Sequence, residues 1–268
     1  MADRPRTLSG NFPQTPGIQP LSRPGGGWQG DSPGRISARG EGSRSPDPVA
    51  RDGAVTTTHL LYLHGFRSSP QSFKARRLQA WLAVHRPDVA WWCPQLPPSP
   101  REAMALVERG TAGWPAATSA VVGSSLGGYY ACTVAHRRGW RCAVINPAVE
   151  PARDLAAHIG ELGAYHDPSQ RFFFRPEFID ELRALAVPAP DDPGRTLAIV
   201  ARGDEVLDWR EMSARHARAT LRLIEGSDHA LSDFDTHLPA LLDFLGLGPW
   251  SPEDPNPDPD STTSSSGP

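Results

Sequence analysis

The chain has 268 residues, with 27 basic side chains against 30 acidic ones and a formal net charge of −3. Such a chain lacks the strong positive field that holds a nucleic acid backbone, which disfavours a general nucleic-acid binder. It contains only 3 cysteines, too few for a disulfide scaffold, and none stands in CxxC metal spacing. Cys93, Cys132 and Cys142 each lie in an apolar stretch and are interpreted as small core residues of a reducing compartment.

Targeting and membrane signals are not found in the sequence. No apolar run reaches the roughly 18 residues that span a bilayer, and the N-terminus has no hydrophobic region of a secretory signal. We therefore expect a cytoplasmic protein with no membrane partner.

The two ends of the chain differ in composition from its middle. Residues 1–56 are rich in proline and glycine, and 249–268 alternate proline with Asp, Asn and Ser. Neither segment has apolar periodicity, so neither can bury enough surface to offset its ordering entropy. We predict disordered extensions at 1–56 and 249–268 around one folded domain at 57–248.

Within this domain, short apolar runs alternate with helical patterns. The predicted elements in chain order are strand 59–63, helix 72–84, strand 89–93, helix 101–108, strand 120–123, helix 126–137, strand 142–145, helix 151–159, helix 176–185, strand 197–201, helix 208–217, strand 221–224 and helix 236–245. Asp208 and Thr236 suit helix N-caps, and Gly139 and Gly246 suit helix ends. Continuous hydrophobic strands alternating with helices indicate an α/β fold with a mostly parallel sheet of about six strands.

Ligands in such sheets bind at the carboxyl ends of the strands, so the residues that follow each strand carry the functional prediction. One strand leads through Gly123-Ser-Ser125-Leu-Gly127 into a helix, which is the strand–turn–helix setting of a G-x-S-x-G nucleophile elbow. Gly123 and Gly127 would flank Ser125 because side chains there would crowd the turn. The alternative is a glycine-rich turn with an idle serine; Ser124 lacks the matching glycine spacing.

A serine hydroxyl needs a base and the base needs an orienting acid. His229 follows the last strand, where the order Ser…Asp/Glu…His of an α/β-hydrolase places the base; the alternative is a loop histidine that caps a helix. Asp204 directly follows strand 197–201 and is the predicted acid. Asp208, interpreted as an N-cap, and Asp228, the neighbour of the base, are its rivals.

An acyl-transfer site also needs donors for the developing oxyanion. The backbone N–H of Leu126 follows the predicted nucleophile. A second donor is expected from the loop after the first strand, and there we assign the backbone N–H of Phe66. His64 is interpreted as a residue that shapes this loop rather than as a base.

These motifs resemble the YqiA-type bacterial esterases of the α/β-hydrolase superfamily. The resemblance is carried by the blocks YLHGFRSSPQSFKA (62–75), PQLPPSPREA (94–103), GSSLGGYYA (123–131), NPAVEPARDL (146–155), GDEVLDWRE (203–211) and DHALSDFD (228–235). It implies a compact hydrolase with a short cap that acts on acyl esters, with acyl-CoA thioesters as a further class. Lys74, the sole lysine, falls in one of these blocks and is interpreted as a cation on a helix surface.

The sequence therefore predicts a serine hydrolase in which Ser125, Asp204 and His229 form the triad, with a small-molecule acyl ester or thioester as its partner and with no cofactor or metal. The stretch 147–195 would form the cap, where Phe172–Phe174 and Phe178 line the pocket or belong to the core. The rival functions are hydrolysis of an amide or peptide bond and a non-catalytic hydrolase-like binding module. The oligomeric state is left open by the sequence.

Overall fold

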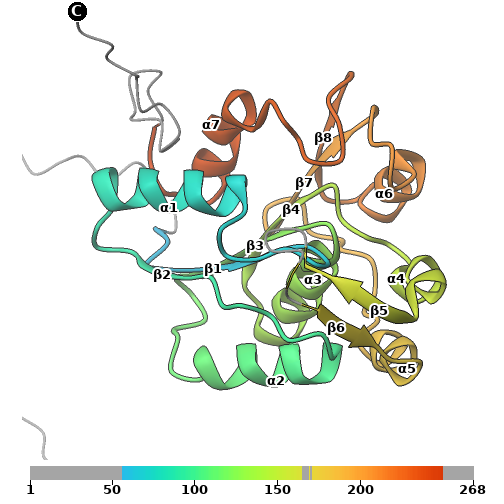
Figure 1. Ribbon diagram of the computed structural model, residues 1–268. Coiled ribbons are helices and arrows are strands. Elements are labelled where there is room, and N and C mark those ends of the chain that lie inside the picture. The colour runs from blue at the N-terminus through green and yellow to red at the C-terminus, as the bar shows by residue number, and fades with distance from the viewer. Residues whose placement is uncertain (1–55, 165–168, 170, 250–268) are drawn as a thin grey trace, which may run out of the picture. The chain divides into compact units, whose positions relative to one another are not determined.

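The computed structural model describes residues 56–164, 169 and 171–249 (Figure 1). Apart from their inner boundary residues, the segments predicted to be disordered lie outside this range. The central sheet has six strands in the order β2-β1-β3-β4-β7-β8, and every neighbouring pair is parallel. Its strands are β1 (His59–Leu63), β2 (Ala90–Trp92), β3 (Ser119–Ser124), β4 (Arg141–Ile145), β7 (Thr196–Ala201) and β8 (Thr220–Ile224). The predicted six-stranded parallel sheet is confirmed.

Helices connect these strands. They are α1 (Phe73–His85), α2 (Pro100–Gly110), α3 (Leu126–Arg138), α4 (Pro151–Asp154), α5 (Glu177–Ala184), α6 (Trp209–Arg215) and α7 (Phe234–Phe244). Between β4 and β7 the chain forms the region predicted as the cap. It contains α4, a 3₁₀ turn, α5 and an antiparallel pair of strands, β5 (Gly160–Gly163) and β6 (Arg171–Phe174).

Helices cover both faces of the sheet, which explains why its strands are apolar throughout. Alternate residues of a strand point to opposite faces, so Leu60 and Tyr62 of β1 belong to one core cluster and Leu61 and Leu63 to the other. The first cluster includes α1 and α7, which lie together in Figure 1; the second includes α2, α3 and α5. The inner strands β3 and β7 are buried along their whole length, as expected for a sheet between two layers.

The predicted helix ends are partly confirmed. Asp208 caps α6, because its carboxylate accepts a hydrogen bond from the Arg210 amide at 2.9 Å. Gly139 ends α3 with a φ of 67°. Thr236 was wrongly assigned as a cap, since α7 begins at Phe234.

The cap region departs most from the prediction. The expected helix 151–159 is only one turn long, and a 3₁₀ turn and strand β5 follow it. The hairpin of β5 and β6 was not predicted. Among the phenylalanines of β6, Phe174 is buried, Phe173 is exposed and Phe172 lies between these extremes.

The strand order places a topological switch between β1 and β3. From β1 the chain runs outward to β2 and then returns to β3 on the other side, so the loops that leave β1 and β3 diverge to opposite faces. A crevice opens at such a point beside the carboxyl ends of the strands. The loop containing Phe66 and the turn containing Ser125 both lie at this end.

Candidate active site

Ser125 occupies a sharp turn between β3 and α3. Its backbone has φ 56° and ψ −123°, a conformation that costs a non-glycine residue about 1–3 kcal/mol. Hydrogen bonds hold it there: the Ser125 amide donates to the Ile145 carbonyl at 3.0 Å, and the Ser125 carbonyl accepts from Ala148 at 3.0 Å and from Gly128 at 2.9 Å. The predicted elbow is therefore present in the structure as a strained turn that the surrounding backbone fixes.

Steric crowding explains why glycine flanks Ser125 on both sides. A Cβ on Gly123 would lie 2.1 Å from the Gly127 carbonyl oxygen, and a Cβ on Gly127 would lie 2.0 Å from that of Leu63. Both obstacles are backbone atoms that cannot move aside as a flexible side chain would. The predicted crowding is thus found at both positions.

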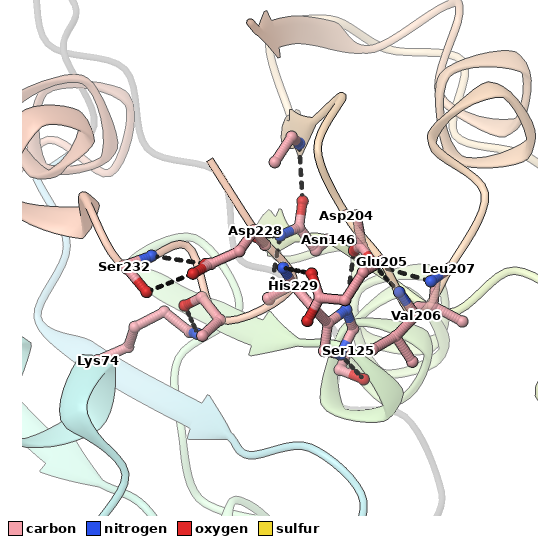
Figure 2. A network of polar contacts seen from close by, with 12 residues as sticks. Lys74, Ser125, Asn146, Asp204, Glu205, Val206, Leu207, Asp228, His229 and Ser232 are labelled. Carbon is pink, nitrogen blue, oxygen red and sulfur yellow. Dashed lines mark hydrogen bonds and ion pairs between the residues drawn. The ribbon is translucent and has the colours of Figure 1, made fainter. Parts of the chain in front are cut away.

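The structure brings Ser125, His229 and Asp204 together from three loops (Figure 2). His229 Nε2 lies 3.1 Å from Ser125 Oγ, and His229 Nδ1 lies 2.8 Å from Asp204 Oδ2. An ionised carboxylate can only accept, so Nδ1 is the protonated ring nitrogen and Nε2 is left to accept the hydrogen of the serine hydroxyl. The arrangement has the hydrogen-bonding order of a nucleophile, a base and an orienting acid.

Asp204 is anchored through both carboxylate oxygens. Its side chain is fully buried, and Oδ1 accepts hydrogen bonds from the amides of Val206 and Leu207, each at 2.8 Å. Oδ2 is therefore directed at His229, whose side chain is 21 % exposed. The buried carboxylate has three donors and no unsatisfied oxygen.

Neither rival acid contacts the imidazole. Asp208 caps α6. Asp228 directs its carboxylate at Ser232, accepting from the amide at 2.9 Å and from the hydroxyl at 2.5 Å. The side chains of the adjacent residues Asp228 and His229 thus bind different partners.

Two residues that sequence reasoning missed fix the loop of His229. Asn146 is completely buried directly after β4, and its amide nitrogen donates to the carbonyls of Asp228 at 2.9 Å and His229 at 3.1 Å. Its Oδ1 accepts from the Ala201 amide at 2.8 Å, which ties the end of β7 to the same loop. Glu205 accepts from the His229 amide at 2.9 Å. The position of Asn146 directly after a strand was the one available signal.

A cavity of about 830 Å³ opens at Ser125 and His229. Phe66 and Leu126, the assigned oxyanion donors, both line it, and a second cavity of about 400 Å³ adjoins it along the same two residues. The Phe66 loop passes close to the serine, since a Cβ on Gly65 would lie 3.2 Å from Ser125 Cβ. Phe172 of β6 lines the second cavity and packs edge-on against Phe66, which is the pocket-lining alternative of the sequence analysis.

His64 shapes the Phe66 loop. Its Nε2 accepts a hydrogen bond from the Leu96 amide at 3.1 Å, so Nδ1 is protonated and donates to the Gly65 carbonyl at 3.0 Å. Both ring nitrogens are engaged by backbone groups, in agreement with the predicted structural role.

The interpretation of Lys74 as a surface cation was wrong. Its side chain lines the same cavity as Ser125, and its ammonium group donates to the carbonyl of Ala230, the residue after His229 (Figure 2). Burial lowers the pKa of Lys74 to about 8, and the carboxylates of Asp228 and Asp204 oppose that shift. Its half-buried position in the first turn of α1 was not visible in the helical periodicity.

The model of the uncharacterised protein family UPF0227 matches residues 59–246. The chain belongs to this family. The match extends from β1 to the end of α7 and so contains the whole central sheet and the residues Ser125, Asp204 and His229. The resemblance to the YqiA family that the sequence motifs carried is confirmed.

Solved structures with the same fold are α/β-hydrolases. This UPF0227 member superposes with a TM-score of 0.54 on mouse alpha/beta hydrolase domain-containing protein 10, at 18 % identity over 71 % of this chain and 91 % of that one. It matches a putative hydrolase from Agrobacterium vitis S4 with a TM-score of 0.57, at 16 % identity over 71 % of this chain and 90 % of that one. The structure of the metagenome-derived lipolytic enzymes LipS and LipT superposes with a TM-score of 0.53, at 19 % identity over 72 % of this chain and 95 % of that one. These likenesses establish the α/β-hydrolase fold.

None of the helices within the described residues is long and apolar enough to cross a membrane. Within the same part of the chain, no group of three or more His, Cys, Asp or Glu side chains is arranged to hold a metal ion.

Proposed function

We propose that this protein is a serine hydrolase that cleaves acyl esters through an acyl-enzyme, with acyl-CoA thioesters as a further substrate class. The observation that carries the proposal is the continuous hydrogen-bond chain from Ser125 Oγ through His229 to the buried Asp204, at 3.1 and 2.8 Å. A strained serine whose hydroxyl faces an acceptor nitrogen is poised to lose its proton as it attacks a carbonyl.

In the first half-reaction Ser125 Oγ bonds to the acyl carbon while His229 Nε2 takes the hydroxyl proton. The carbonyl electron pair moves onto oxygen, and the negative charge is received by the amides of Phe66 and Leu126. Collapse of this intermediate expels the alcohol or thiol, which takes the proton from Nε2. Water then attacks the acyl-enzyme with the same base and releases the acid.

Asp204 has two tasks in this scheme. It keeps the proton on Nδ1, so that Nε2 is free to act as the base, and it stabilises the imidazolium that forms. Because its other oxygen is held by the amides of Val206 and Leu207, the carboxylate cannot rotate away from the imidazole. Asn146 and Glu205 act as positioning residues through the backbone of the His229 loop.

The cavity supports a small-molecule substrate. Its volume of about 830 Å³ lies in the range of about 300–1,000 Å³ that is typical of ligand sites. Apolar side chains at the serine, among them Leu126, Leu155 and Leu207, suit an acyl chain.

The test is a panel of nitrophenyl esters and acyl-CoA thioesters from acetyl to palmitoyl, with matched anilides, assayed with the full chain. We expect hydrolysis of esters, and we expect Ser125→Ala to lower kcat by up to about 10⁶-fold. Ser124→Ala is the matched control and should lose far less. Hydrolysis of the anilides alone would favour the amide-hydrolase alternative, and no turnover of any member would favour a binding module.

A further inference from the structure

A second cluster of reactive side chains lies away from the serine. Cys132 of α3 and Cys142 of β4 both line a cavity of about 340 Å³ that shares no lining residue with the two cavities at Ser125. Cys142 is 1 % exposed, whereas Cys132 is partly exposed. Cys132, which the sequence analysis interpreted as a core residue, packs against the core but is only partly buried.

A histidine faces the sulfur of Cys132. His216, at the end of α6, is buried, and its Nε2 lies 3.8 Å from Cys132 Sγ. Its Nδ1 lies 2.9 Å from the Met212 carbonyl oxygen, which can only accept, so Nδ1 carries a hydrogen. The neutral ring therefore presents the lone pair of Nε2 to the thiol, and His216 can take its proton.

The second thiol completes the cluster. Cys142 lines the same cavity as Cys132, and its thiol, together with the imidazole of His216, lowers the pKa of Cys132 to about 5. The neighbouring sulfur of Cys132 and burial both raise the pKa of Cys142. Cys93 differs from Cys132, because burial raises its pKa to about 12.

We propose that Cys132 is a nucleophilic thiol with His216 as its base and Cys142 as its resolving partner, forming a redox site that reacts with peroxides. His216 takes the proton of Cys132, and Cys132 Sγ attacks one oxygen of hydrogen peroxide. The O–O bond breaks, the second oxygen leaves as hydroxide and takes the proton from His216 to become water, and Cys132 is left as a sulfenic acid. The Cys142 thiol then attacks this sulfur and expels a second water, forming a disulfide. Two thiols are oxidised and one peroxide is reduced to two waters.

The first test is the pH dependence of alkylation of the native full chain by iodoacetamide, followed for each cysteine by peptide mass spectrometry. Only the thiolate reacts, so the rate of an ordinary thiol of pKa 8.5 rises about 75-fold from pH 6 to pH 8. We expect the rate at Cys132 to change by less than about twofold over this range. A rise at Cys132 as steep as that of an ordinary thiol, or faster labelling of Cys93 than of Cys132, would overturn the proposal.

Other titratable groups also surround this sulfur, so substitutions must show which of them lower the pKa of Cys132. The charged or titratable side chains that face Cys132 or line its cavity are Tyr129, His136, Cys142, Asp191, Asp192, Arg195, Arg215 and His216. His216→Gln and Cys142→Ala each remove one of the two groups that the proposal invokes. Both should move the midpoint of the Cys132 profile upward by at least about one pH unit. His136→Gln, which leaves both groups in place, is the matched control and should leave the midpoint unchanged.

The second test is oxidation. Trypsin cleaves at Arg137 and Arg141, which separates the two cysteines into different peptides. After treatment of the full chain with hydrogen peroxide, we expect these peptides to be joined by a disulfide, and a sulfenic acid on Cys132 to accumulate in Cys142→Ala. Because the wild-type chain itself carries this test, it does not depend on the folding of a variant. Oxidation that falls on Cys93 first, or that yields no cross-link, contradicts the proposal.

Discussion

Replacing Asp204 by asparagine changes one atom of the candidate triad and, through it, the tautomer of His229. Oδ1 of Asp204 accepts two backbone hydrogen bonds at 2.8 Å, so the amide oxygen of an asparagine would take that place. The NH₂ group would then face Nδ1 of His229 as a donor. Nδ1 would have to accept, and the ring proton would move to Nε2, opposite the serine.

The size of the effect follows from this geometry. A ring that carries its proton on Nε2 cannot accept the proton of Ser125, so the base is lost while the packing of the site is kept. The loss of kcat for such a tautomer change is about 10⁴-fold, which corresponds to about 5.4 kcal/mol in the activation free energy. Turning the amide to restore the tautomer would set its NH₂ against two backbone donors, which leaves both amides unsatisfied at a cost of about 1–3 kcal/mol each.

The assay compares kcat of Asp204→Asn with that of Asp208→Asn on the best ester of the panel, with thermal unfolding recorded for both. Asp208→Asn is the matched control, because asparagine caps a helix about as well as aspartate. We expect the first variant to be folded and nearly inactive and the second to be active. A folded Asp204→Asn variant within about tenfold of wild-type kcat would refute the assignment of the acid.

Three further predictions concern folding and stability. Gly127→Ala should prevent recovery of folded protein, because its Cβ would lie 2.0 Å from the Leu63 carbonyl oxygen, whereas Gly113→Ala, with open space around the new methyl, should fold normally in the same expression test. Asn146→Ala should lower the free energy of unfolding in urea by roughly 1–3 kcal/mol and reduce kcat, because it leaves a buried amide without its acceptor. The pKa of Lys74 lies near 8 in the fold against about 10.5 when unfolded, so the unfolded chain binds more protons between these values. The deprotonation of Lys74 should therefore make the free energy of unfolding in urea rise with pH between pH 8 and pH 10, and Lys74→Met should remove this rise. The same pH dependence of the unfolding free energy in both proteins would contradict the prediction.

Local patterns in the sequence were sufficient to predict the main sheet. Strands that are buried on both faces appear as continuous apolar runs, and each of the six predicted runs overlaps a strand of the parallel sheet. The secondary structure of the cap was harder to predict from the sequence. The β5 and β6 strands are four residues each and lie mostly outside the core. β5 is Gly-Glu-Leu-Gly with one apolar side chain, and the three phenylalanines of β6 are too short a run to distinguish a strand from a helix segment. The helix predicted at 151–159 ends at Asp154, and a 3₁₀ turn at Ala156–His158 separates it from β5.

The residues of the site also divide into those that local sequence patterns predict and those whose role depends on distant partners. Ser125, Asp204 and His229 each directly follow a strand or lie in the loop that leaves it, so chain order and fold rules placed them. The role of Asn146 depends on partners 55 to 83 residues away, and nothing in its own neighbourhood reveals them. Lys74 and Cys132 likewise have ordinary helical surroundings in the sequence. Their environments arise only when distant loops and strands pack against α1 and α3.

The most direct test of the proposed mechanism is labelling of the full chain with a fluorophosphonate, followed by peptide mapping. Such a probe phosphonylates a serine only when a base activates its hydroxyl. The geometry at Ser125 predicts a stoichiometric adduct on that residue, slowed in Asp204→Asn and absent in Ser125→Ala. A folded wild-type protein that stays unlabelled, or that carries the adduct on another serine while Ser125 is unmodified, would contradict the proposed mechanism.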